Sequence, residues 1–201
     1  MHLFTTSSSP NGRRVAVVMK EKGLVIPTTE VDLRSGSNLA ADFKAKNPVG
    51  LVPVLETDNK VFISETVAIS RYLESLVPEP CLFGITGEEQ ALIEMWNRRA
   101  ELSLLIPVAQ AFRNQTGIFK DREQVSAEWG AISADRARLA MPMFEEQLAG
   151  HAYLAGDKFS IADITLALTL SFAKAVGQDL LQSPAILAWH TKVSARPSFA
   201  S

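Results

Sequence analysis

Strand-like patterns in this chain stop at one short segment, VPEPCLFG, residues 77–84. Its two prolines are separated by a single residue, and proline removes a backbone donor and interrupts both helices and strands. Before this segment, short β-rich runs alternate with helical patterns, whereas after it the apolar residues repeat only with a helical period. The chain is therefore expected to form an α/β domain over 1–77, a linker over 78–86 and an all-α domain over 87–201.

The first domain shows seven elements in the order βαβαββα. Strands and helices are expected at 2–6, 13–22, 28–33, 38–46, 52–56, 60–64 and 65–76. The polar turn TDN at 57–59 joins two of these strands and is typical of a hairpin. A mixed sheet with helices packed against it follows from this order.

The second domain is expected to contain four helices. They are predicted at 88–112, 121–149, 161–176 and 183–196. Pro107 and Pro142 lie inside the first two patterns and are expected to kink them, because each proline removes an intrahelical donor. Ser160 and Asp163 form a capping-box variant at the third helix, which indicates a structural role for both.

Composition narrows the range of partners. The 201 residues are 47% hydrophobic and carry a formal net charge of −2 without long runs of one sign, so nothing favours nucleic acid or an anionic membrane. No basic-then-apolar leader and no apolar run of about 20 residues is present, which favours a cytoplasmic protein. The one cysteine, Cys81, cannot form an intrachain disulfide.

The stretch SSSPNGRR, residues 7–14, places polar side chains at a predicted helix start. Pro10 suits the first helical turn, so Ser8, Ser9 and Asn11 gather at the N-terminal end. Backbone N–H groups there favour an anion or a thiolate. The alternative is that Ser9 only caps the helix.

Two further segments have the same double interpretation. In NPVGLVPVLE, 47–56, a cis peptide before Pro53 would turn the Val52 backbone outward to pair with an extended ligand, whereas a trans proline at an edge strand is the ordinary state. In SETVAISRYL, 64–73, Glu65 and Thr66 start a helix, either to hold a carboxylate or simply as a cap.

Taken together, these motifs resemble those of the cytosolic glutathione transferase family. The pair N-P-x-G-x-V-P and E-[ST]-x-A-I at this separation carries the resemblance, with FSIADITL at 159–166 as a further match. The resemblance extends over essentially the whole chain. It implies a thioredoxin-like N-terminal domain, βαβαββα, followed by an all-α C-terminal domain.

The resemblance also implies roles for particular residues. The sequence SPNG is similar to the T-P-N-G of a bacterial subgroup in which threonine and asparagine face the glutathione sulfur, so Ser9 and Asn11 are the expected catalytic residues. Ser8 is the next candidate for a catalytic residue, because serine-type members of the family have their catalytic hydroxyl at its position. At the glutathione site, Val52, next to Pro53, would pair with the cysteinyl portion, and Glu65 with Thr66 would hold the γ-glutamyl end.

One position departs from the family pattern. Many relatives have lysine where this chain has Leu51, and that lysine contacts the glycyl carboxylate. Leucine cannot make this contact. The candidates to replace it are Lys44, Lys46 and Arg34.

The second substrate is expected against a helix of the all-α domain. The residues concerned are Trp96, Arg99, Leu102 and Phe112. Apolar residues at helical spacing also suit a core, so this interpretation stays open beside the pocket. The three histidines have no metal-ligand spacing, and no metal is expected.

The leading functional hypothesis is a glutathione transferase that attacks a small hydrophobic electrophile with bound glutathione. One alternative is a glutathione-dependent disulfide or peroxide reductase. Another, from a different class, is a non-catalytic protein-binding module of the same fold. This alternative is considered because Leu51 replaces the lysine that contacts glutathione in many relatives. A homodimer is expected from the resemblance.

Overall fold

The computed structural model describes residues 1–200, and the chain divides into two compact units, Met1–Cys81 and a second that begins at Leu82. The division falls inside the segment 78–86 that the sequence predicts as a linker. Within residues 1–200, no helix is both long and apolar enough to cross a lipid bilayer.

A four-stranded mixed sheet forms the centre of the first unit. Its strands are β1 (His2–Thr5), β2 (Thr28–Glu30), β3 (Val54–Glu56) and β4 (Phe62–Ser64), in the spatial order β2-β1-β3-β4. Strand β1 runs parallel to β2 and antiparallel to β3, and β3 pairs antiparallel with β4. The predicted mixed sheet and hairpin are therefore confirmed.

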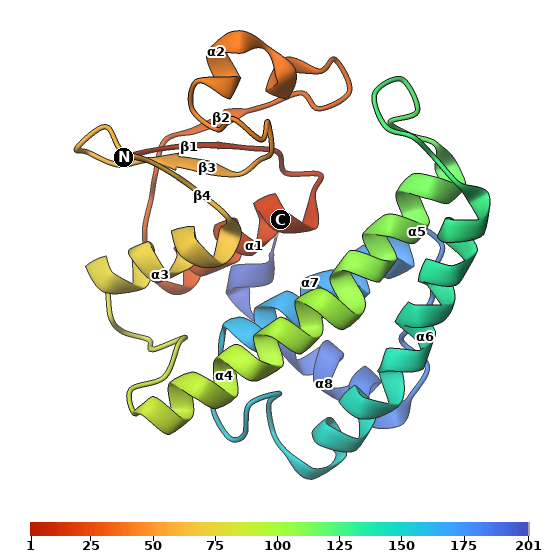
Figure 1. Ribbon diagram of the computed structural model, residues 1–201. Coiled ribbons are helices and arrows are strands. Elements are labelled where there is room, and N and C mark those ends of the chain that lie inside the picture. Colours follow the sequence, from red (N-terminus) through yellow and green to blue (C-terminus); the bar gives the residue numbers. More distant parts are fainter. Residues whose placement is uncertain (201) are drawn as a thin grey trace. The chain divides into compact units, whose positions relative to one another are not determined.

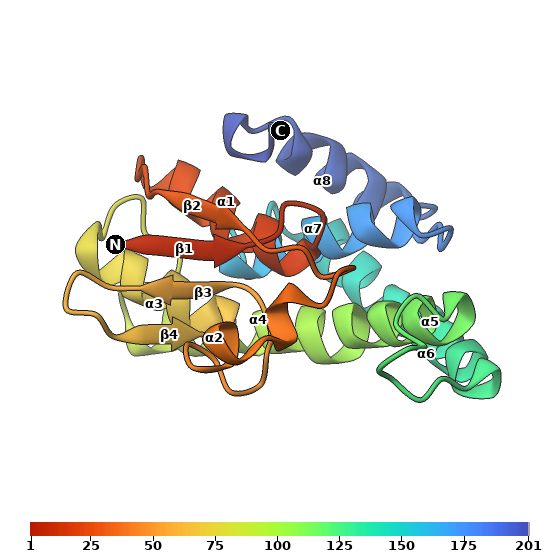
Figure 2. The same cartoon turned by 90° about the horizontal axis from the view of Figure 1, so that it is seen from above.

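Helices cover both faces of this sheet. Helices α1 (Pro10–Glu21) and α3 (Thr66–Leu76) lie on one face, and α2 (Ala41–Lys44) lies on the other, preceded by a 3₁₀ turn at Ser37–Leu39 (Figures 1 and 2). On the α2 side Phe4 packs against a cluster of Val31, Phe43 and Val54. Its neighbour Leu3 is buried and, because strand side chains alternate, points to the opposite face. The fold of this unit is thioredoxin-like.

The second strand and the second helix are among the elements of the first unit that are shorter than predicted. The strand expected at 28–33 ends at Glu30, because the Asp32 carboxylate accepts the backbone N–H groups of Arg34 and Ser35 and closes a turn. The helix expected at 38–46 is interrupted at Ala40, whose extended backbone, φ −65° and ψ 152°, separates the 3₁₀ turn from α2.

The second unit is helical. Its elements are α4 (Gly87–Ala100), α5 (Ile106–Thr116), α6 (Ala127–Gly150), α7 (Ile161–Ala175), α8 (Pro184–Ser194) and a 3₁₀ turn at Pro197–Phe199. Helices α5 and α6 lie side by side, and α7 packs against α4 (Figure 1). Of the 15 residues of α7, 11 are buried, so this helix forms the centre of the unit. The predicted thioredoxin-like unit followed by an all-α unit is confirmed.

The first long helical pattern contains a π-helical segment, Glu101–Leu105, between α4 and α5. The N–H of Ile106 donates to the carbonyl of Glu101, five residues back, and Pro107 follows directly. A π turn placed here accommodates a residue that has no N–H to donate. At Pro107, where a kink is predicted, the structure thus has a π turn, whereas α6 runs through Pro142, the second predicted kink, as one helix.

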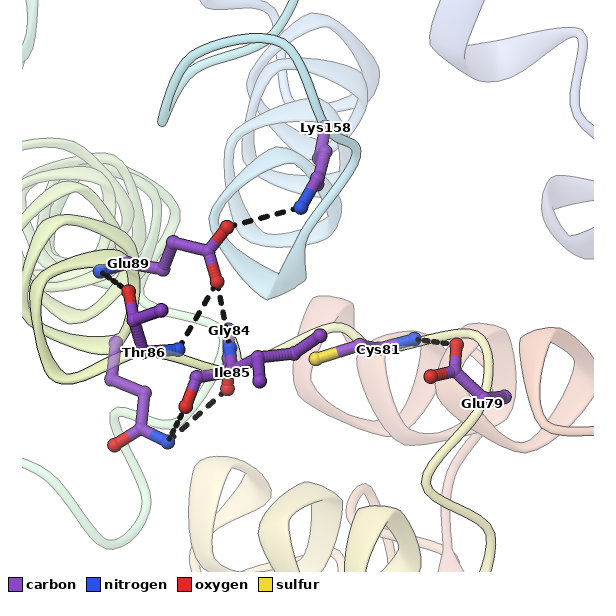
Figure 3. A network of polar contacts seen from close by, with 8 residues as sticks. Glu79, Cys81, Gly84, Ile85, Thr86, Glu89 and Lys158 are labelled. Atoms are coloured by element: carbon purple, nitrogen blue, oxygen red, sulfur yellow. Dashed lines mark hydrogen bonds and ion pairs between the residues drawn. The ribbon is translucent and has the colours of Figure 1, made fainter.

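The start of α4 carries a capping box that sequence inspection missed. Thr86 Oγ1 accepts a hydrogen bond from the N–H of Glu89, and the Glu89 carboxylate accepts hydrogen bonds from the N–H groups of Ile85 and Thr86 (Figure 3). The same carboxylate forms an ion pair with Lys158. The Ile85 bond, followed by those from Lys158 and Thr86, lowers the pKa of Glu89 to about 2. The local turn before α4 is therefore held by an ionised carboxylate at neutral pH.

The start of α7 carries the predicted capping box. Asp163 accepts from the backbone N–H of Ser160, and its other oxygen accepts from the N–H of Leu154 and from Trp189 Nε1 at 3.1 Å. The carboxyl group is buried, and burial raises its pKa to about 6 despite these donors. Asp163 therefore joins three segments of the second unit, which supports its structural role.

Candidate functional site

The first helix begins at Pro10, which suits a first helical turn, three residues before the helical pattern predicted at 13–22, and Ser9 is its N-cap. Ser9 Oγ accepts the backbone N–H of Gly12 at 2.9 Å, so Ser9 caps the helix, whereas its expected role at the ligand sulfur stays a prediction. In that bond the Ser9 oxygen accepts through a lone pair, so the hydroxyl proton of Ser9 takes no part in it. The nearest acceptor is the Thr6 carbonyl at 3.5 Å, a long bond. Ser9 therefore caps the helix and still has a proton to donate to a ligand.

The neighbouring Ser8 hydroxyl has a different bonding state. Ser8 Oγ lies 3.1 Å from Thr6 Oγ1, and the Thr6 proton is donated to Glu30 Oε1 at 2.6 Å. Because the Thr6 proton is committed to a carboxylate, Ser8 is the donor in the Ser8–Thr6 bond. Ser8 then presents only lone pairs outward. The hydrogen bonds thus distinguish Ser8 from Ser9, the two serines that the sequence proposes as candidates.

Glu30 anchors the loop that carries these serines. Its carboxylate accepts the Ser7 N–H at 3.0 and 3.1 Å in addition to the Thr6 hydroxyl. Glu30 is the last residue of β2, and Thr5, its register partner, is the last of β1. Strand β2 thus fixes the loop from the side, a role that sequence inspection missed.

Gly12 allows α1 to start close to the end of β1. A Cβ at this position would lie 2.1 Å from the Thr6 carbonyl oxygen and 2.6 Å from Thr5 Oγ1. No larger residue fits without moving the helix. Between Gly12 and Pro10, Asn11 is half-buried, and within residues 1–200 its amide has no hydrogen-bond partner. The amide is thus available to a ligand.

The Val52-Pro53 peptide is cis. Strand β3 starts two residues later, and the N–H and C=O of Val52 have no partner in the part of the chain that the structure describes. The Val52 side chain packs against the cluster of Val31, Phe43 and Val54. Because packing holds the Val52 side chain in place, its backbone N–H and C=O, which have no partner among the described residues, are suited to pairing with an extended peptide ligand.

The start of α3 combines backbone strain with a buried hydroxyl. Glu65 has φ 67° and ψ 122°, a left-handed conformation that is rare for a residue other than glycine. Such strain is stored at functional sites more often than elsewhere. Thr66, the first residue of the helix, is buried, and its Oγ1 accepts from Arg14 Nη1 at 2.7 Å. Sequence inspection missed Arg14.

The cations near Leu51 differ in their surroundings. Leu51 itself is 48% exposed. Lys46 Nζ donates to the Asp42 carbonyl and lies 5.4 Å over the Phe4 ring. Lys44, by contrast, brings its Cε within 3.7 Å of where a Cβ on Gly50 would lie, and has no ion-pair partner among residues 1–200. Neither lysine has an ion-pair partner among residues 1–200, and Lys44 is the one whose side chain reaches Gly50 in the 47–52 loop.

The four residues predicted to line a substrate pocket have separate environments in the second unit. Trp96 is buried against Phe144, with Arg99 stacked 4.5 Å from its ring. Phe112 meets Phe172 edge to face, whereas Leu102 is exposed. Their role in substrate binding stays a prediction. No three His, Cys, Asp or Glu residues within 1–200 gather closely enough to hold a metal ion.

The chain forms a thioredoxin-like unit followed by an all-helical unit and has no cysteine at the start of the first helix. This arrangement agrees with the class that the sequence motifs resemble, the cytosolic glutathione transferases. Residues 3–81 match the family described as Glutathione S-transferase, N-terminal domain, and residues 111–197 match Glutathione S-transferase, C-terminal domain. The chain belongs to the glutathione S-transferase family. The resemblance read from the sequence motifs is therefore confirmed.

Individual relatives agree with this assignment. Glutathione S-transferase 2 of Saccharomyces cerevisiae is 37% identical over 206 residues, which covers 98% of this chain and 87% of the yeast protein. A glutathione S-transferase domain-containing protein of Marinobacter aquaeolei matches with a TM-score of 0.96 and 36% identity over 100% of both chains. A class Gtt2 glutathione S-transferase of Vibrio parahaemolyticus matches with a TM-score of 0.89 and 37% identity over 100% of this chain and 96% of that one.

Proposed function

We propose that the protein is a glutathione transferase that holds glutathione as a thiolate at the start of α1 and joins it to a small hydrophobic electrophile. Two neighbouring groups at the start of α1 carry this proposal: the Ser9 hydroxyl, which caps the helix and whose proton makes only a long bond of 3.5 Å to the Thr6 carbonyl, and the Asn11 amide, which has no hydrogen-bond partner among residues 1–200. The chain has no cysteine there, since its one cysteine is Cys81. The thiol must therefore come from a bound molecule, and glutathione supplies it.

The chain's own groups would depress the pKa of that thiol and orient it. The proton of Ser9 and the N–H groups of the first turn of α1 stabilise a negative charge on sulfur, since a thiolate accepts hydrogen bonds more strongly than a thiol. A new S–C bond then forms as the electrophilic carbon releases its leaving group or shifts electrons into its conjugated system. No protein residue forms a covalent bond in this scheme.

The remaining contacts support a tripeptide in an extended conformation. The unpaired N–H and C=O of Val52 suit the cysteinyl residue. The strained Glu65 and the hydroxyl of Thr66, at the N-terminus of α3, suit the γ-glutamyl carboxylate. Lys44 is our candidate for the glycyl carboxylate in place of the missing lysine at Leu51.

We predict that Ser9→Ala and Asn11→Ala each raise the pKa of bound glutathione by about one unit, which corresponds to the loss of one hydrogen bond to a charged group. Titration of thiolate absorbance with saturating glutathione measures this. Ser8→Ala is the matched control, because Ser8 donates its proton to Thr6, and it should leave the pKa unchanged. If Ser8→Ala alone raises the pKa, the assignment of the two serines is reversed.

Activity assays separate the competing reactions. The transferase hypothesis expects turnover of an aryl halide with glutathione. Turnover of a disulfide or a peroxide without that of the aryl halide would favour a reductase. Retention on immobilised glutathione without any turnover would favour a non-catalytic binding module.

We further propose a cytoplasmic homodimer. Helices α5 and α6 lie side by side and bear large exposed apolar residues, with Ile106 on the first and Trp129, Ile132 and Leu139 on the second. Exposed apolar groups on neighbouring helices are typical of subunit contacts. Light scattering should give twice the chain mass of 21.9 kDa. Leu139→Asp should lower this mass, whereas a wild-type mass of one chain would contradict the dimer. A single cysteine suits a reducing compartment.

A further inference from the structure

A buried arginine links the two helices on one face of the first unit. Arg14, in α1, is only 1% exposed, and its Nη1 donates to Thr66 Oγ1 at the start of α3 over 2.7 Å. The two residues are 52 positions apart in sequence. Burial of a guanidinium is costly unless it makes strong hydrogen bonds, so the bond to Thr66 calls for a functional explanation.

The bond with Arg14 determines what the Thr66 hydroxyl offers. A hydroxyl has one proton and two lone pairs, whereas a guanidinium only donates. Arg14 therefore occupies a lone pair of Thr66 Oγ1, and the proton of Thr66 must point elsewhere. Within residues 1–200 that proton has no acceptor, although Thr66 is only 6% exposed.

We propose that Arg14 is a positioning residue for the α-carboxylate of the γ-glutamyl group. It holds Thr66 in the orientation that donates to this carboxylate, and it adds a buried positive charge to the N-terminal end of α3, which already favours an anion. Glu65, whose backbone is strained, is the N-cap of the same helix. The inference rests on the proposed binding of glutathione.

One consequence is that α1 contributes to both ends of the ligand. Ser9 and Asn11, at its first turn, serve the thiol, and Arg14, one turn later, serves the glutamyl end through Thr66. Helices α1 and α3 pack directly against each other, so the bond between Arg14 and Thr66 fixes the relative position of the two subsites.

Two probes isolate this role. Glutathione carries the α-carboxylate, and 4-aminobutanoyl-cysteinylglycine is the same tripeptide without it. Calorimetry on the full-length protein gives a dissociation constant for each, and their ratio measures recognition of the carboxylate. In the wild type we expect a ratio of about tenfold or more, as for a charge-assisted hydrogen bond.

The variants are Arg14→Met, Thr66→Val and the double variant. Each single substitution should reduce the ratio to about threefold or less, and the double variant should be no worse than either single one, because both residues act through one contact. Lys22→Met is the matched control. Lys22 is also a buried cation of this helix, at its C-terminal end and paired with Glu74, so its loss should lower the thermal midpoint without changing the ratio.

The outcomes are distinguishable. No binding of glutathione by the wild type means that the proposed function fails. Binding with equal affinity for both probes, a ratio that Arg14→Met leaves unchanged, or additive losses in the double variant would overturn the inference alone. If Arg14→Met does not fold, Arg14→Lys and Thr66→Val decide: Thr66→Val should reduce the ratio to about threefold or less, and Arg14→Lys should also reduce it.

Discussion

Gly12→Ala is expected to lower the free energy of unfolding by about 3 kcal/mol or more and to abolish glutathione binding. The added Cβ would lie 2.1 Å from the Thr6 carbonyl oxygen, a backbone atom that no rotamer change can move. The first turn of α1 must therefore shift away from β1. Because that turn carries Ser9 and Asn11, a shift of this kind displaces the groups proposed to hold the sulfur.

Gly87→Ala is the matched control for this substitution. Gly87 is the first residue of α4, and a Cβ there meets nothing within 4 Å. Alanine favours helix more than glycine does, so this variant should be neutral or slightly stabilising. Thermal and denaturant unfolding measure both variants. A Gly12→Ala protein with wild-type stability and wild-type glutathione affinity would show that the loop before α1 yields easily.

Asp163→Ala is expected to lower the free energy of unfolding by about 3–5 kcal/mol, the cost of removing one partner from a buried charged network. The loss of the carboxylate leaves the N–H groups of Leu154 and Ser160 and the indole N–H of Trp189 without an acceptor. This exceeds the contribution of about 1 kcal/mol from an ordinary helix cap. Glutathione affinity of the folded fraction should remain that of the wild type. A loss under 1 kcal/mol in chemical denaturation would contradict the network.

The sign of the pH dependence at this position follows from the raised pKa. Burial raises the pKa of Asp163 from 3.8 to about 6, so between these values the folded state binds more protons than the unfolded state. The contribution of Asp163 to stability therefore falls as pH rises from 3.8 to about 6. Asp163→Asn removes this slope, and the gap between its thermal midpoint and that of the wild type should narrow over that range.

Local signals in the sequence account for the elements that were predicted well. Pro10 starts α1, the TDN turn joins β3 and β4, and the Ser160–Asp163 box starts α7. In each case the determining groups lie within a few residues of one another, so the pattern can be read without knowledge of the tertiary structure. The same locality made Ser9 recognisable as a helix cap.

Apart from the local capping box of Thr86 and Glu89, the interactions that the sequence did not reveal are those between distant segments. Glu30 contacts Thr6 across 24 residues, and Arg14 contacts Thr66 across 52. A glutamate at a strand end and an arginine in a helix are ordinary residues in isolation. The parallel pairing of β1 and β2 is the signal that brings Glu30 beside the serine loop, because strands that run parallel end at the same edge.

The anchoring of the serine loop by Glu30 affects how a ligand would bind. Two bonds to the Ser7 N–H and one to the Thr6 hydroxyl already fix this loop in the free protein. A preorganised loop loses little conformational entropy when a ligand arrives, so more of the interaction energy remains as affinity. If the proposed ligand binds here, the acidic residue at the end of β2 would strengthen its binding without touching it, because the loop is already ordered before the ligand arrives.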